Sequence, residues 1–158
     1  MKVILPGSYD PVTLGHLDII ERAAAEYDDV RAVIFVNPEK KYSFSVEERL
    51  HMLSLATSHI PNVSVDFYGG YVVDYMKKEG IDKIVKGYRS DADLEYERVQ
   101  ADYNFSHGGY PTELYRCREE LSRVSSTLAR ERIFSGGSLD GILPASVIEY
   151  IKSKKSDN

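Results

Sequence analysis

The sequence contains a single cysteine, Cys117, so the chain can form no disulfide bond within itself. Its cysteine and histidine residues also lack the paired spacing that is typical of a zinc site. A reducing compartment fits these absences best, and we expect a cytoplasmic protein.

Positive charge is in short supply as well. Lysine and arginine number 20 against 25 acidic residues, which gives a formal net charge of −5. Proteins that bind nucleic acid usually carry a basic surface that neutralises phosphates. The composition therefore disfavours nucleic acid as a partner. An acidic chain can still contain a local basic pocket.

Long hydrophobic runs are missing too. The apolar run at the N-terminus ends at Leu5 and turns at Pro6-Gly7, which is too short for a signal peptide or a membrane span. We therefore expect no membrane partner. The chain also has no G-x-x-x-x-G-K-[ST] string, which disfavours a P-loop kinase.

The length and core-forming residues predict one domain over residues 1–158. A chain of 158 residues with 42% hydrophobic content can bury one core but is short for two domains. No internal repeat, low-complexity tract or linker divides it. The polar tail from about Lys152 carries three lysines, and we expect it to fray.

Short β-branched or apolar runs alternate with amphipathic stretches along the chain. This alternation predicts an α/β fold with a doubly wound five-stranded parallel sheet. The predicted strands are Val3 to Leu5, Val30 to Val36, Val63 to Phe67, Lys83 to Val85 and Thr112 to Arg118.

Capping residues and glycines mark the ends of several predicted helices. Ser45 and Glu48 have capping-box spacing at a helix start, and Gly80 is suited to a left-handed helix end. We expect a loop over residues 106–111. The predicted helices begin after Gly15, at Ser45, near Tyr71, at Asp93 (towards Asn104), after Ser125, and at Pro144 (to Lys152).

Ligands of doubly wound sheets bind beyond the carboxyl ends of the strands. This rule predicts that three polar segments meet in one crevice, namely Ser8 to His16, Asn37 to Lys41 and Lys86 to Arg89.

The first of these segments combines glycine with a histidine at the start of a helix. Gly7 lets the backbone approach a ligand closely, and the exposed N–H groups of a helix N-terminus favour anions. The His16 imidazole could donate a hydrogen bond to a phosphate oxygen as charge builds there. Taken alone, the same residues are more typical of an ordinary turn followed by a histidine with structural partners.

Three further groups offer cations or hydroxyls suited to phosphate. Lys40 and Lys41 follow the second strand, Arg89 follows the fourth, and Ser122 to Thr127 begin a late helix. Each group has an ordinary alternative: surface lysines, a charged helix face beside a strand end, or a simple N-cap.

The string Gly-Ser-Tyr-Asp-Pro-x-Thr-x-Gly-His resembles the T/HxGH signature of the nucleotidylyltransferase superfamily. Thr13 makes it similar to the bacterial phosphopantetheine adenylyltransferase family in particular. The resemblance extends over nearly the whole chain. It includes N-P-x-K-K followed by Phe44 to Arg49, G-x-R followed by D-x-E-Y-E, and S-x-x-S-S-T at Ser122.

The resemblance implies a Rossmann-like nucleotidyltransferase fold and a set of site residues. The implied catalytic residues are His16 and Lys40, with Lys41 as the alternative lysine. The implied ATP contacts are Ser8, Tyr9, His16, Gly87, Tyr88, Arg89, Glu97, Leu121, Ser122, Arg123, Val124, Ser125, Ser126 and Thr127. The implied acceptor contacts are Ser8, Lys40, Val72, Lys86, Asn104 and Glu131.

The activity implied by the resemblance is transfer of the adenylyl group of ATP to 4′-phosphopantetheine, which gives dephospho-coenzyme A and pyrophosphate. Mg²⁺ would offset phosphate charge, although the sequence suggests no carboxylate cage for it. The resemblance also implies a homohexamer and feedback inhibition by coenzyme A. No metal-ligating residue is predicted in the chain.

Two stretches depart from the family pattern. Lys86 stands where the family more often has arginine, so it keeps the charge but loses the planar fork. Residues 105–121 are more polar than the apolar strand of the relatives. Two other functions therefore stay open: nucleotidylyl transfer to a different acceptor, such as a phosphorylated sugar or nicotinate mononucleotide, and nucleotide sensing without catalysis.

Overall fold

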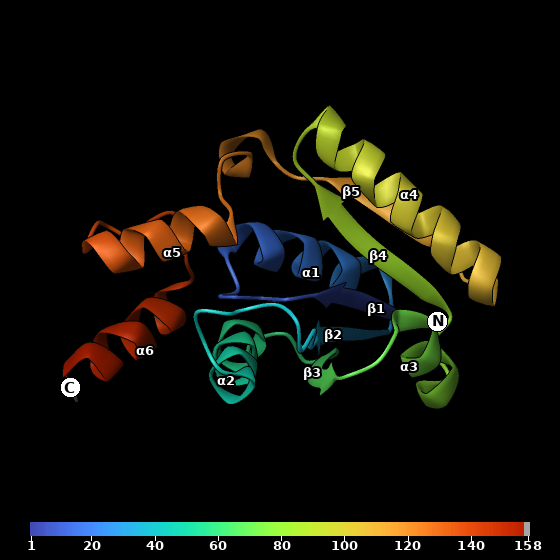
Figure 1. Cartoon of the computed structure of the whole chain (residues 1–158), viewed down its shortest axis with the longest axis horizontal. Coiled ribbons are helices and arrows are strands. Elements are labelled where there is room, and N and C mark those ends of the chain that lie inside the picture. Colours follow the sequence, from blue (N-terminus) through green and yellow to red (C-terminus); the bar gives the residue numbers. More distant parts are fainter. Residues whose placement is uncertain (157–158) are drawn as a thin grey trace.

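Strands and helices alternate along the chain in the computed structural model, which describes residues 1–156 (Figure 1). The strands are β1 (Lys2–Gly7), β2 (Asp29–Phe35), β3 (Val63–Tyr68), β4 (Lys83–Tyr88) and β5 (Thr112–Arg116). The helices are α1 (Leu14–Glu26), α2 (Val46–Thr57), α3 (Val72–Glu79), α4 (Asp91–Gly108), α5 (Ser126–Ser135) and α6 (Ala145–Ser156), with a 3₁₀ turn at Glu119–Leu121.

The five strands form one parallel sheet in the order β3-β2-β1-β4-β5. This topology confirms the predicted doubly wound, Rossmann-like sheet. The chain passes outward from β1 through β2 and β3 and then returns to β4 on the other side of β1. The carboxyl ends of β1 and β4 therefore flank the point where the strand order reverses, which is where such sheets bind ligands.

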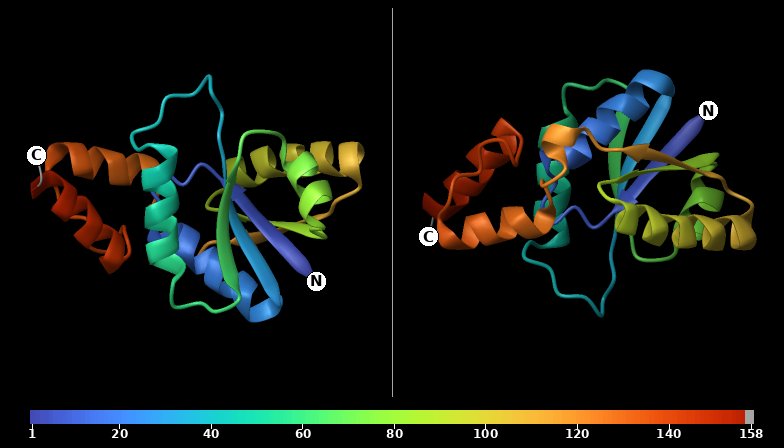
Figure 2. Two further views of the ribbon diagram at one scale, coloured as in Figure 1. Left: turned by 90° about the horizontal axis from the view of Figure 1, so that it is seen from below. Right: turned by 90° about the horizontal axis from the view of Figure 1, so that it is seen from above.

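The central strand β1 is apolar and buried over Val3 to Leu5 because helices cover both faces of the sheet. Val3 and Leu5 join a large core cluster with α1 and α2, whereas Ile4 between them joins a smaller cluster with Met76 of α3. Helices α5 and α6 lie at one end of the molecule and α4 lies at the other (Figure 2). No helix within residues 1–156 is both long and apolar enough to span a membrane.

Predicted helix ends are confirmed where capping chemistry sets them. The Ser45 hydroxyl accepts a hydrogen bond from the Glu48 N–H (3.1 Å), and the Glu48 carboxylate accepts from the Ser45 N–H (2.9 Å). Gly80 ends α3 with a φ of 67°, in the left-handed region that glycine adopts without steric cost.

The predicted loop over residues 106–111 is wrong in its first half, because α4 continues to Gly108. Two glycines in sequence suggested an earlier end. The helix stops only at Gly109, where a φ of 74° lets its N–H donate to the Phe105 carbonyl (2.8 Å). The fifth strand begins at Thr112 as predicted but ends at Arg116, two residues earlier than predicted.

The tail expected to fray from about Lys152 is helical to Ser156. Two contacts explain the difference: Lys154 forms an ion pair with Glu48 of α2, and the Lys155 ammonium donates to the Ile133 carbonyl (3.0 Å). Lysines in a last helical turn also complement the helix dipole. The final two residues of the predicted tail lie outside the described part of the chain.

Candidate active site

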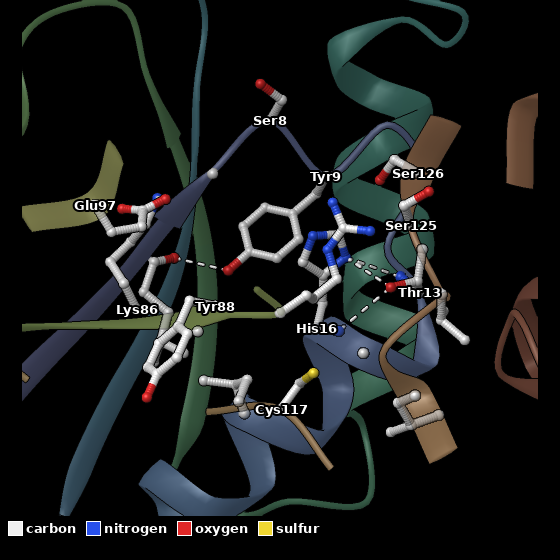
Figure 3. Close-up of a pocket in the computed structure, with 18 of the residues that line it drawn as sticks. Ser8, Tyr9, Thr13, His16, Lys86, Tyr88, Glu97, Cys117, Ser125 and Ser126 are labelled. Atoms are coloured by element: carbon white, nitrogen blue, oxygen red, sulfur yellow. Dashed lines mark hydrogen bonds and ion pairs between the residues drawn. The ribbon is translucent and has the colours of Figure 1, made fainter. Parts of the chain in front are cut away.

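A cavity of about 300 Å³ lies at the carboxyl ends of β1 and β4. Figure 3 shows Tyr9 and His16 at its centre, with Lys86 and Glu97 on one side and Ser125 on the other. The cavity thus brings the first motif and the end of β4 together, as the strand-end rule predicts, and the start of α5 joins them.

A second cavity of about 210 Å³ adjoins the first and extends towards α3 and α4. The two cavities share five lining residues, so they meet at the end of β1. These residues are Pro6, Gly7, Ser8, Lys86 and Glu97.

His16 is held in the first cavity by a capping box at the start of α1. Its backbone N–H donates to the Thr13 hydroxyl (3.3 Å), and its Nδ1 accepts from the Thr13 backbone N–H (3.0 Å). Because Nδ1 accepts a backbone N–H, the proton of the neutral ring sits on Nε2. His16 therefore offers an N–H donor rather than a base.

The electrostatic surroundings of His16 keep it neutral. Burial, and after it the positive charges of Lys86 and Arg89, together lower the pKa of His16 to about 4. Near neutral pH the ring is an uncharged donor in a region of positive potential. Such a group stabilises negative charge that develops on a nearby phosphate.

Tyr9 forms the floor beside His16. The two ring centroids lie 4.9 Å apart, and the Tyr9 hydroxyl donates to the Leu5 carbonyl (2.8 Å). Burial raises the pKa of the Tyr9 hydroxyl, so it stays protonated. A side chain at Gly7 would begin 3.1 Å from the Tyr9 ring, which explains the glycine there. The ring of Tyr9 lines the cavity, and its contact with ATP stays a prediction.

The cations of the crevice are paired with carboxylates. Lys86 Nζ lies 3.4 Å from the Glu97 carboxylate, and Arg89 Nε lies 3.4 Å from that of Asp93. Gly87 between them cannot carry a side chain without displacing Ile19, since a Cβ would lie 2.7 Å from Ile19 Cγ1. A bound phosphate would compete with these carboxylates for the same cations.

The hydroxyls at the start of α5 face the cavity but already have protein partners. Ser125 Oγ caps the helix by accepting from the Leu128 N–H (3.0 Å), and Ser126 Oγ donates to the Pro11 carbonyl (2.8 Å). The N-cap interpretation is therefore confirmed for Ser125, and its contact with ATP stays a prediction. Among the other predicted ATP contacts, Tyr88, Leu121 and Val124 line the cavity, whereas Ser122, Arg123 and Thr127 do not.

Four of the six predicted acceptor contacts line the second cavity, and the other two lie elsewhere. Ser8, Val72, Lys86 and Asn104 line it. Within residues 1–156, the Ser8 hydroxyl and the Asn104 amide have no hydrogen-bond partner, so both are available to a ligand. Glu131 lies outside both cavities, exposed on α5, so this structure does not bring it to the other acceptor residues.

Lys40 and Lys41 also lie outside both cavities, contrary to the expectation that the three strand-end segments meet. They are exposed on the loop between β2 and α2, which projects from the body of the molecule (Figure 2). Lys40 is held there over the ring of Tyr42, with Nζ 5.5 Å from the ring centroid.

The sequence did not single out two residues that fix the geometry. The buried Asp10 carboxylate accepts hydrogen bonds from the backbone N–H groups of Ser43 (2.9 Å) and Phe44 (3.0 Å). The buried Arg49 donates to the Ser8 carbonyl (3.0 Å). Together they tie the first motif to the stem of the lysine loop. An Asp-Pro pair before a helix and an arginine directly before the apolar positions of α2 were the signals available.

No group of three or more histidine, cysteine or acidic side chains is arranged to hold a metal ion within residues 1–156. The side chains of the crevice are instead cations, hydroxyls and one paired carboxylate. This set suits anionic ligands.

A family model described as cytidylyltransferase-like matches residues 4–132. Three curated relatives named phosphopantetheine adenylyltransferase align along almost their full length. The relative from Corynebacterium efficiens is 43% identical over 155 residues, which cover 98% of each chain. The chain belongs to the phosphopantetheine adenylyltransferase family. Corynebacterium diphtheriae has a relative 43% identical over 96% of this chain and 99% of its own. One from Corynebacterium glutamicum is 41% identical over 99% of both.

Membership of the phosphopantetheine adenylyltransferase family agrees with the arrangement of the crevice. The matched region begins in β1 and ends in α5, and it therefore spans every element that lines the two cavities.

Proposed function

We propose that the chain transfers the adenylyl group of ATP to 4′-phosphopantetheine and releases pyrophosphate. The observation that carries the proposal is the pair of adjoining cavities that meet at Ser8 and Lys86, with a neutral, donor-bearing His16 in the larger one. ATP would occupy the larger cavity, and the acceptor arm would occupy the smaller one. The reacting phosphates would then meet at the shared wall.

The reaction needs no general base. The acceptor phosphate is already anionic near neutral pH, and its oxygen forms a bond to the α-phosphorus while the bond to the β-phosphate oxygen breaks. Pyrophosphate leaves with the electron pair of the broken bond. Positioning and charge neutralisation therefore carry the catalysis.

Each part of the crevice has a role that follows from its chemistry. His16 Nε2–H would donate to an oxygen of the α-phosphate as charge builds there, and Ser8 would orient the acceptor phosphate. Lys86 would exchange the Glu97 carboxylate for the acceptor phosphate. Arg89 and the N-terminus of α5 would hold the remaining phosphates of ATP.

Lys40 requires a movement in this scheme. Its loop is exposed, and its ammonium rests on Tyr42 outside the cavities. ATP would attract it by charge, and the lysine would then add a second positive group at the α-phosphate. The long flexible stem of lysine suits a group that must reach over an opening.

Mg²⁺ is proposed as the counter-ion of ATP. The chain's own carboxylates do not form a metal site within residues 1–156, so the phosphates would have to supply most of the ligands. We derive no step of the reaction from the ion.

Pyrophosphate release by the purified protein with ATP, Mg²⁺ and 4′-phosphopantetheine tests the proposal. We expect the wild type to be active and the His16→Ala variant to lose about a hundredfold or more in kcat with little change in ATP affinity. An inactive wild type, equal to His16→Ala, would contradict the proposal. If kcat and ATP affinity fell together, the transition-state role of His16 would be wrong.

The same assay decides between the alternatives. Preferential use of a phosphorylated sugar or nicotinate mononucleotide would indicate nucleotidylyl transfer to another acceptor. Tight ATP binding without turnover on any acceptor would indicate a nucleotide sensor. The uncommitted Ser8 and Asn104 side chains in the second cavity can bind any polar acceptor arm, and the names of the relatives favour phosphopantetheine.

Three further properties are proposed on the basis of family membership. They are assembly into a homohexamer, inhibition by coenzyme A and residence in the cytoplasm. Several large apolar side chains of α4 are exposed, which is consistent with an oligomer. Sedimentation and inhibition measurements on the purified protein would test the first two.

A further inference from the structure

The loop that carries Lys40 is compact although it is exposed. Asn37 closes it with three contacts: its side-chain oxygen accepts from the Glu39 N–H (3.0 Å), its carbonyl accepts from the Lys40 N–H (3.1 Å), and its N–H donates to the Tyr42 hydroxyl (3.2 Å). The backbone on either side of Lys40 is therefore preorganised before any ligand arrives.

The ring of Tyr42 contacts two cations. Its ring centroid is 3.9 Å from the guanidinium carbon of Arg49 and 5.5 Å from Lys40 Nζ. Both contacts are cation–π interactions, and the ring is the only group that connects the lysine to the body of the protein within the described residues. An exposed cation–π contact is weak, so a polyphosphate can displace it.

Arg49 anchors this stack to the first motif. Its side chain is 2% exposed, and it donates to the Phe44 carbonyl (3.2 Å) and the Ser8 carbonyl (3.0 Å). No carboxylate forms an ion pair with it in the described chain. A buried cation satisfied by carbonyls and a ring is held in one orientation by those partners. The stack therefore has a fixed base next to Ser8.

We propose that Tyr42 and Arg49 are positioning residues that hold Lys40 ready beside the crevice and set its distance from Ser8. The Tyr42 ring keeps the ammonium in a weak, displaceable contact, and Arg49 fixes the ring to the strand end that presents Ser8. When ATP enters, Lys40 exchanges the ring for a phosphate oxygen while the loop keeps its shape. The inference rests on the proposed function, because it assigns Lys40 to the reacting phosphate.

A double-mutant cycle on kcat tests the coupling of Tyr42 to Lys40. We expect Tyr42→Leu to lower kcat by roughly threefold to tenfold, with a smaller change in the KM for ATP, because the lysine loses its support. In a Lys40→Ala background, the same substitution should cause no further loss. Tyr42→Phe keeps the ring and should stay within about twofold of the wild type.

Tyr150 supplies a matched control. It is a half-buried tyrosine with a lysine, Lys154, 5.7 Å from its ring centroid, and it lies outside both cavities. Tyr150→Leu should leave kcat unchanged in both backgrounds. Thermal melts of every variant would show whether each remains folded.

The possible results separate cleanly. The inference would be overturned if Tyr42→Leu lowered kcat equally in the wild-type and Lys40→Ala backgrounds. It would also be overturned if Tyr42→Leu did not lower kcat at all. So would an unchanged kcat in Lys40→Ala, because Lys40 would then have no role to support. A wild type that releases no pyrophosphate would instead refute the proposed function, and the inference would fall with it.

Discussion

The two ring nitrogens of His16 have different roles. Its Nδ1 completes a capping box with Thr13, and this structural bond leaves Nε2–H for the cavity. The ordinary interpretation of a satisfied histidine is confirmed at Nδ1, and the role of Nε2–H as a phosphate donor stays a prediction. Glutamate usually occupies this capping position, so histidine there is a signal that the sequence contains and that spacing alone could have revealed.

The lowered pKa of His16 predicts how stability depends on pH. In the folded state the pKa is about 4, below its usual value near 6.5, so the unfolded chain binds the proton more readily between these values. Stability from this group is therefore full above about pH 6.5 and is lost as the pH falls towards 4.

Between pH 7 and pH 5, we expect the free energy of unfolding of the wild type to fall by about 2 kcal/mol more than that of His16→Asn. Asparagine keeps an acceptor for the Thr13 N–H but has no proton to gain. Urea unfolding at the two pH values measures the difference. Equal losses in the two proteins would contradict the neutral, buried state of the histidine.

At the scale of elements, the loops that leave β1 and β2 are joined to one another. The Asp10 carboxylate caps two N–H groups at the stem of the lysine loop, and Arg130 of α5 donates to the Asp10 carbonyl (2.8 Å). Three segments that are distant in sequence are thus fixed by one buried acid. This arrangement explains how a loop can stay compact while it projects from the molecule.

Replacing Asp10 tests this junction. Asp10→Asn keeps the size but turns an NH2 donor, which cannot accept a hydrogen bond, towards one of the two N–H groups, and we expect the free energy of unfolding to fall by about 1–3 kcal/mol. The KM for both substrates should rise because the stem supports Ser8 and Lys40. Asp28→Asn is the control: Asp28 has an almost fully exposed side chain and should change stability by less than about 0.5 kcal/mol. A similar small change in Asp10→Asn would show that the junction is unimportant.

Local signals predicted the elements well and their ends less well. The strand pattern, the capping box at Ser45 and the glycine end at Gly80 are local, and the structure confirms them. The ends of α4 and α6 depend on a left-handed glycine one residue further on and on contacts with distant residues such as Glu48. No pattern within either segment reports those contacts.

At the scale of the whole molecule, the order of the strands creates the site. The reversal at β1 and β4 opens one crevice that divides into two cavities, and the strand-end rule located two of the segments that line them, Ser8 to His16 and Lys86 to Arg89, from sequence alone. It failed for Lys40 because β2 lies one strand away from the reversal and its loop points outwards. It could not assign Glu131 either, since the position of α5 is set by tertiary packing.

The two adjoining cavities imply that the adenylyl group moves between two ligands bound side by side. ATP carrying a radioactive label at either the α- or the γ-phosphate tests this claim directly, in the presence of Mg²⁺ and 4′-phosphopantetheine. We predict that the α-label appears in the acceptor product and the γ-label in pyrophosphate. A γ-label in the acceptor product, or an α-label that appears only in free AMP, would contradict the account.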